Sequence, residues 1–295
     1  MTSIFTYNNL SMIMLHLQES VALICDFENW CEFENQQIEK LKLIAKENNL
    51  STTLLVPIAG DTNPGLWNQN NIGTKAKEFK IDQVIFYVIH PMMKLLDEQS
   101  LYQNLHGFLN LKKILKPKHY TSRIAQAFNS QFFEKMWKED FILGDNFLEK
   151  KTDPILIGML YANQFEQFYK ATGLKYQFSA RVVEGKKLGR QLGYPTINLL
   201  TPDLIPVNKG VYACDVYIEH LDQHFLGAGC YWKNELDQDV FEIFLLDFDK
   251  EIYGWKVDVT IIEKIRDSIP VTSIQHLKEL LAGDVLKVKD VKSWF

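Results

Sequence analysis

The sequence predicts two domains: an α/β domain built on a doubly wound parallel sheet, then an all-β antiparallel barrel that ends in a helix. Three observations carry this prediction. The chain of 295 residues is long for one hydrophobic core. Its first half alternates apolar runs with stretches of helical spacing. After Tyr176 the pattern changes to short β-rich runs separated by turn residues.

In the first half, three apolar runs are expected to be strands buried on both faces, at 21–25, 51–57 and 83–89. The segment 35–48 between the first two has apolar residues at helical spacing. Strand, helix and strand in this order predict parallel pairing.

The segment 121–172 is expected to add further helices. Its apolar face is expected to lie in the core rather than at a ligand site, and it consists of Phe132, Phe133, Met136 and Trp137. We expect the domain boundary at Thr172-Gly173, which gives domains of residues 1–172 and 173–295.

The second domain has β-rich runs at the spacing of a small antiparallel barrel. They are residues 210–218, 225–231, 240–246 and 256–265, and one helix is expected at 273–281.

Composition limits the function classes. A net charge of -5 argues against a nucleic-acid partner, which would need a basic face. The four cysteines are widely spaced and form no CxxC pair, so neither a disulfide framework nor a zinc site is expected. The sequence shows neither a signal peptide nor a run of apolar residues that could span a membrane. We therefore expect a cytoplasmic protein with no membrane partner.

The segment 185–198 is the most informative part of the sequence. Its glycines expose backbone N–H groups that can approach the phosphates of a nucleotide, and its basic side chains add positive charge. A hydroxyl and an amide oxygen follow, both of the hard ligand type that Mg²⁺ accepts. The candidate phosphate-binding residues are Gly185, Lys187, Gly189, Arg190, Gly193 and Thr196, and the candidate metal ligands are Thr196 and Asn198.

The order of these residues resembles the signature of the riboflavin kinases. The matching strings are Ala180-Arg-Val-Val-Glu-Gly185 and Leu188-Gly-Arg-Gln-Leu-Gly-Tyr-Pro-Thr-Ile-Asn198, with Tyr194 where the family has phenylalanine and Ala180 where glycine is usual. The resemblance continues through Gly210-Val-Tyr-Ala213, Phe241-Glu-Ile-Phe-Leu-Leu-Asp-Phe-Asp249, Ile252-Tyr-Gly254 and Ile265-Arg-Asp267.

This resemblance implies a six-stranded barrel that transfers the γ-phosphate of ATP to the 5'-hydroxyl of riboflavin and releases FMN, with Mg²⁺ as cofactor. It assigns the base that receives the hydroxyl proton to Glu242. The strand pattern agrees, since Phe241, Ile243 and Leu245 share one face and Glu242 lies on the other. A solvent-facing or lysine-paired glutamate is the alternative.

The resemblance also implies flavin contacts. Arg266 matches an arginine that the family places near the flavin and nucleotide, and its alternative is a surface ion pair to Asp267 or Glu263. The strand that usually continues into Asn-Ile-Gly and Pro-Thr-Phe reads Cys-Tyr-Trp-Lys-Asn here, so Tyr231 and Trp232 are expected to supply replacement stacking. Val271 also stands where phenylalanine is usual.

The N-terminal domain resembles the nucleotidylyltransferase half of bifunctional riboflavin kinase/FAD synthetases. Cys25-Asp-Phe-Glu-Asn-Trp-Cys-Glu-Phe-Glu-Asn35 lies on their Gly-x-Phe-Asp-Gly-x-His-x-Gly-His-Gln motif. Cys31 and Glu34 replace the two histidines, and the glycines are replaced by Cys25, Asn29 and Phe33. We expect this half to keep the fold without making FAD, because histidines and glycines of this kind hold a triphosphate at a helix N-terminus.

Two other functions stay open. The chain could still be bifunctional and make FAD from FMN and ATP through a remodelled site. It could also be a non-catalytic regulator that binds flavin or nucleotide, which the altered flavin segments favour and which Thr196, Asn198 and Glu242 disfavour.

Overall fold

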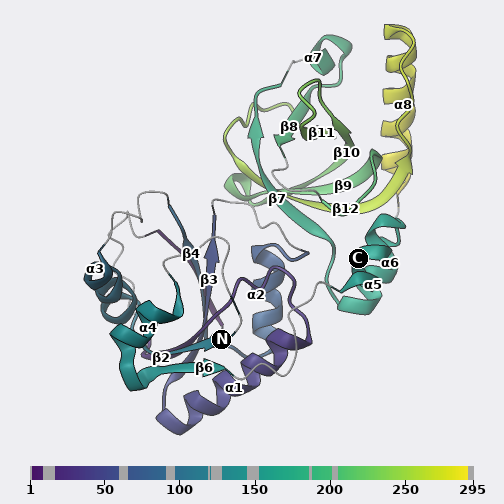
Figure 1. Cartoon of the computed structure of the whole chain (residues 1–295). Coiled ribbons are helices and arrows are strands. Elements are labelled where there is room, and N and C mark those ends of the chain that lie inside the picture. Colours follow the sequence, from purple (N-terminus) through teal and green to yellow (C-terminus); the bar gives the residue numbers. More distant parts are fainter. Residues whose placement is uncertain are drawn as a thin grey trace. The chain divides into compact units, whose positions relative to one another are not determined.

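The computed structural model describes residues 2–8, 17–59, 66–90, 97–118, 120, 128–144, 153–185, 188–200 and 205–291. The chain divides into two compact units, Met1–Thr152 and Asp153–Phe295 (Figure 1). Helices α5 (Pro154–Tyr161) and α6 (Phe165–Thr172) precede the boundary expected at Thr172-Gly173, and both are grouped with the second unit.

The first unit is a six-stranded sheet in the order β1-β4-β3-β2-β5-β6, and every pair is parallel. This confirms the doubly wound parallel sheet and its three expected strands. The strands are β1 (Ser3–Tyr7), β2 (Ser20–Ile24), β3 (Ser51–Ile58), β4 (Gln83–Val88), β5 (Leu111–Pro117) and β6 (Phe141–Gly144).

Helices cover both faces of this sheet, with α1 and α2 on one side and α3 and α4 on the other (Figure 1). Helix α1 covers the expected segment and buries Ile38, Leu41 and Ile44. The helical elements are α1 (Glu32–Asn48), α2 (Gln69–Glu78), α3 (Glu98–Tyr102), the π-helical turn Gln103–Phe108, α4 (Ser130–Trp137) and the 3₁₀ turn Lys138–Asp140.

The described parts of the segment 121–172 are only partly helical. Helix α4 buries Phe132, Phe133 and Trp137 as expected, and Met136 is half-buried. The expectation misses strand β6, which pairs with β5 through Ile114 and Phe141. A four-residue apolar run cannot be assigned to helix or strand by its spacing, and here the free edge of β5 decides the outcome.

The second unit is a closed antiparallel barrel in the order β10-β11-β8-β7-β12-β9. This confirms the six-stranded barrel and the four strands whose ranges the sequence predicts. They are β7 (Gln177–Val183), β8 (Thr196–Leu200), β9 (Gly210–Ile218), β10 (Gln223–Lys233), β11 (Asp239–Leu245) and β12 (Lys256–Arg266). Short helical turns α7 (Leu188–Leu192) and Glu219–Leu221 interrupt the connections.

Helix α8 (Ile274–Asp290) lies along the outer face of the barrel. The sequence predicts an end at residue 281, but the helix continues through Gly283 because its later turns pack on the barrel. Val288 is fully buried in a cluster with Ala213, Leu246 and Ile262. This burial outweighs the cost of one glycine, about 1 kcal/mol in a helix interior.

The barrel interior is aromatic. Phe241 is fully buried and lies 5.6 Å, centroid to centroid, from Tyr231 and 6.3 Å from Tyr212. Gly229 lets this packing form, since a Cβ there would come within 2.4 Å of the Phe241 ring. Because side chains fill the interior, any ligand of the barrel would lie on its outer face or rim.

Candidate active site

Thr196 and Asn198 lie on β8, and Glu242 lies on the neighbouring strand β11. The register pairs Asn198 directly with Glu242 and Thr196 with Phe244. Side chains opposite one another in an antiparallel pair have Cβ atoms about 4.5–5.5 Å apart. The two metal-ligand candidates and the candidate base therefore share one small patch of the sheet.

This patch faces outward from the barrel. Phe241, Ile243 and Leu245 are buried in the interior, whereas Glu242 and Phe244 are half-buried on the other face. The alternation expected around Glu242 is confirmed. The Asn198 side chain is 9% exposed, so a polar ligand would approach it from one side only.

The glycine segment folds back onto the same patch. A Cβ built on Gly185 would come within 2.4 Å of Asn198 Nδ2, and one on Gly189 would come within 2.3 Å of the Tyr194 carbonyl oxygen and 3.5 Å of Thr196 Oγ1. Gly193 adopts a left-handed φ of 87°, which favours glycine. The glycines therefore bring the backbone close to both metal-ligand candidates. Lys186 and Lys187 lie outside the described residues.

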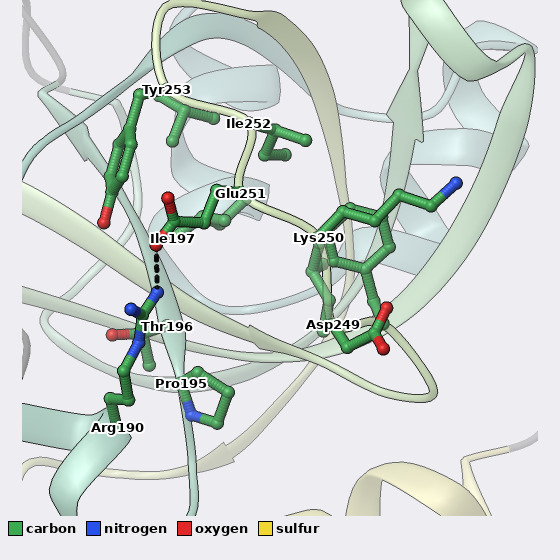
Figure 2. Close-up of a pocket in the computed structure, with 12 residues that line it drawn as sticks. Arg190, Pro195, Thr196, Ile197, Asp249, Lys250, Glu251, Ile252 and Tyr253 are labelled. Atoms are coloured by element: carbon green, nitrogen blue, oxygen red, sulfur yellow. Dashed lines mark hydrogen bonds and ion pairs between the residues drawn. The ribbon is translucent and has the colours of Figure 1, made fainter.

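A pocket lies beside Thr196 (Figure 2). Arg190, Pro195 and Thr196 contribute to one side of its lining, and the loop of residues 248–253 contributes to the other. Figure 2 shows Arg190 joined to Glu251, with 2.7 Å between Nη2 and Oε1. This hydrogen-bonded pairing raises the pKa of the Arg190 guanidinium, although both side chains are more than half exposed.

Sequence reasoning missed the pocket residues Asp249, Lys250, Glu251 and Tyr253. A signal was present, because Ile252-Tyr-Gly254 is one of the strings that resemble the riboflavin kinases. Gly254 has a φ of 78°, which marks a turn that shapes this loop.

The outer face carries a row of residues in direct register across five strands. Asn198 pairs with Glu242, Glu242 with Cys230, Cys230 with Val211, and Val211 with Arg266. Burial, with a smaller contribution from the neighbouring Glu242 carboxylate, raises the pKa of the Cys230 thiol to about 11, while Arg266 opposes the shift. Sequence reasoning did not single out Cys230.

At the far end of this row, Arg266 is held by α8. Its Nε and Nη2 donate to the two oxygens of Asp284 at 2.8 and 2.7 Å, and its Nη1 donates to the carbonyl oxygen of Asp267 at 3.0 Å. The alternative of a surface ion pair to Asp267 or Glu263 is wrong, because the carboxylate partner is the buried Asp284.

The two aromatic flavin candidates point to opposite faces of β10, since successive side chains alternate along a strand. Tyr231 is 1% exposed inside the barrel, where it stacks on Phe241. Trp232 is half-buried and lies on the same face of the strand as Cys230, two residues earlier. The structure therefore does not bring Tyr231 to the patch, and of these two candidates Trp232 is the one on that side. Val271 is exposed.

In the first unit, Glu34 occupies the N-terminus of α1. Its fully buried carboxylate accepts the Cys31 backbone N–H at 2.9 Å and lies 3.3 Å from Cys31 Sγ and 3.6 Å from Cys25 Sγ. A carboxylate of the chain thus takes the positive end of the helix dipole, where a phosphate would otherwise bind.

Cys25, Asp26 and Glu34 also place one thiol and two carboxylates within 4.8 Å of one another, a combination that could hold a metal ion. The cysteine spacing in the sequence gave no sign of this cluster, because only one thiol belongs to it.

Comparison with known proteins decides the class of the second unit. Residues 172–292 match the Flavokinase family, described as riboflavin kinase. The second unit contains a riboflavin kinase domain. The six-stranded barrel with its C-terminal helix is the fold expected from the sequence resemblance.

Curated relatives carry the name bifunctional riboflavin kinase/FMN adenylyltransferase. The chain is 32% identical over 136 residues to the protein of Buchnera aphidicola, a match that covers 44% of this chain and 43% of that one. It is 36% identical over 121 residues to the Haemophilus influenzae protein, covering 40% and 39%. The chain thus matches about two fifths of the length of these relatives.

A solved structure described as a macrolide-efflux protein from Streptococcus pneumoniae is similar over 98% of this chain and 99% of its own, with a TM-score of 0.54 and 19% identity. That likeness concerns the fold alone. None of the helices in the described parts of the chain is both long and apolar enough to cross a membrane.

Proposed function

We propose that this protein is an ATP-dependent riboflavin kinase, which transfers the γ-phosphate of ATP to the 5'-hydroxyl of riboflavin and produces FMN. The observation that carries the proposal is the cross-strand pairing of Asn198 with Glu242 inside a riboflavin kinase domain. Phosphoryl transfer needs a charge-neutralising site and a nearby group to receive the hydroxyl proton. This pairing supplies candidates for both.

The residues at the patch fit Mg²⁺. Thr196 and Asn198 offer a hydroxyl and an amide oxygen, and their i, i+2 spacing on β8 puts them on one face. Gly185 carries no Cβ where one would overlap the Asn198 side chain. When bound there, Mg²⁺ would neutralise charge on the phosphates of ATP.

Glu242 is the proposed base. Its position opposite Asn198 keeps its carboxylate beside the proposed phosphate site, within reach of a hydroxyl group that is placed for transfer. Gly189 and Gly193 would let backbone N–H groups approach the phosphates. Arg190 would contribute positive charge after its contact with Glu251 is replaced by one with a phosphate oxygen. Lys187, on the same segment, stays a candidate for phosphate binding.

On the flavin side, we propose contacts from Trp232 and Arg266. Trp232 lies two residues after Cys230 on β10, so its side chain is on the same face of the strand as Cys230, which pairs with Glu242. Arg266 lies at the end of the same row. Tyr231, also expected from the sequence, would act only indirectly by supporting the strand from inside the barrel.

We further propose that the N-terminal unit makes no FAD. The buried Glu34 carboxylate satisfies the N-terminus of α1 from within, so an incoming triphosphate would meet a negative charge in place of hydrogen-bond donors. The expected cellular location of the whole protein is the cytoplasm.

One assay separates the three candidate functions. Purified full-length protein is incubated with riboflavin, ATP and Mg²⁺, and the flavins are separated by chromatography. FMN alone supports the proposal, and FMN followed by FAD supports the bifunctional alternative. Formation of neither product, with flavin or nucleotide still bound, supports the regulator.

A further inference from the structure

The buried ion pair between Arg266 and Asp284 joins β12 to α8. The two side chains are 18% and 5% exposed, and the contact is bidentate. Asp284 lies one helical turn before Val288, the buried residue that anchors α8 on the barrel. The helix therefore presents a carboxylate and an apolar anchor to the same face of the barrel.

Anchoring alone does not account for this pair. Replacing a buried ion pair by apolar residues of similar volume is often neutral or stabilising, because taking two charges out of water is costly. The apolar cluster around Val288 already holds the helix. What the pair adds is a fixed position for the guanidinium, since a bidentate contact sets both its distance and its plane.

The held guanidinium keeps donors for a ligand. An arginine side chain carries five N–H groups. Within the described part of the chain, Asp284 engages two of these groups and the Asp267 carbonyl engages a third. Two N–H groups remain, at the end of the row that leads through Val211 and Cys230 to Glu242. Beyond the effect of burial, the Glu242 and Asp284 carboxylates raise the pKa of the Cys230 thiol and Arg266 lowers it, in agreement with the place of Arg266 in this row.

We propose that Asp284 is a positioning residue for riboflavin binding: it holds the Arg266 guanidinium so that its two remaining N–H groups meet the flavin substrate. The proposal rests on the riboflavin kinase function proposed above. It assigns to α8 a part in substrate recognition, through residues that do not line the pocket beside Thr196.

The test compares Asp284→Asn with Asp290→Asn in the full-length protein. The asparagine keeps the shape of the aspartate but loses the charged bidentate contact, whereas Asp290 is exposed at the end of the same helix. A hydrogen bond to a charged group contributes enough free energy for an effect of about tenfold. We expect KM for riboflavin to rise about tenfold in Asp284→Asn, with kcat and KM for ATP within about twofold of wild type. Asp290→Asn should match wild type.

A purely structural role gives a different pattern. If the pair only fastens α8, Asp284→Asn lowers the Tm and changes kcat and both KM values together, and the proposal is overturned. Should that variant not fold, Asp284→Glu keeps the charge on a longer side chain. The proposal then requires a folded Asp284→Glu protein with a raised riboflavin KM and an unchanged ATP KM, and an unchanged riboflavin KM overturns it.

If the proposed kinase function itself is wrong, wild-type protein forms no FMN, which distinguishes that failure from failure of the positioning role. In that case, the quenching of riboflavin fluorescence still measures binding to wild type and to Asp284→Asn. An equal Kd for the two proteins rejects the positioning role, and a Kd about tenfold higher for the variant supports it.

Discussion

Gly185 offers the sharpest test of how the glycine segment serves the proposed site. In Gly185→Ala, the added methyl group would lie 2.4 Å from Asn198 Nδ2 and 2.5 Å from its Cγ. Ordinary contacts between such atoms are about 3.5 Å or longer, so the Asn198 amide must move by about 1 Å. A displacement of that size at a site that positions reacting groups costs about 100-fold in rate.

Stability should change little, because the overlap involves the end of a side chain and not the backbone. We expect kcat/KM for FMN formation to fall about 100-fold while the free energy of unfolding stays within about 1 kcal/mol of wild type. The matched control is Gly158→Ala on α5, where a methyl group would have nothing within 4 Å. It should keep full activity and gain about 0.5–1 kcal/mol of stability.

The assay is steady-state FMN formation at saturating ATP and Mg²⁺, with urea unfolding measured on the same preparations. Wild-type activity in folded Gly185→Ala would refute the reasoning. So would an equal loss of activity in Gly158→Ala.

Three further outcomes are expected. Glu242→Gln should lower kcat by about 10²–10⁴-fold with ATP affinity nearly intact, measured by turnover and nucleotide titration, and unchanged turnover would exclude Glu242 as the base. Glu34→Ala should remove the cap of α1 and destabilise the first unit by about 1 kcal/mol, measured by chemical denaturation, without affecting FMN formation. FAD formation that depends on Glu34 would contradict an inert N-terminal unit. The rate of Cys230 alkylation, followed by peptide mass spectrometry, should be low at pH 8 and rise about tenfold per pH unit towards the thiol pKa of about 11, because only the thiolate reacts. A rate that levels off below pH 9 would contradict the buried thiol.

The fold could be predicted where periodicity was long and regular. Helix α1 and strands β2, β3 and β4 carry continuous patterns of helical or buried-strand type, and their burial is as expected. Strand β6 and the last turns of α8 could not be predicted. Strand β6 forms because it pairs with β5, and the last turns of α8 form because Val288 packs on the barrel. These partners are distant in the sequence, so the local pattern does not reveal them.

For the candidate site too, the local sequence predicts some features, and others depend on partners that are distant in the sequence. The sequence order around Thr196, Asn198 and Glu242 identifies these residues as site candidates, and the barrel register places Asn198 opposite Glu242. Register also separates Tyr231 from Trp232, because neighbouring side chains on a strand face opposite ways. The Asp284 partner of Arg266 could not be read from spacing, since it depends on where α8 crosses the barrel.

The central claim is tested most directly by following the phosphate itself. Wild-type protein is mixed with riboflavin, Mg²⁺ and ATP labelled at the γ-phosphate, and the flavins are separated and counted. Our account predicts that the label appears in FMN in proportion to the ADP formed, and that Glu242→Gln nearly abolishes it. Label released only as inorganic phosphate, or no ATP consumption by folded protein, would contradict the account.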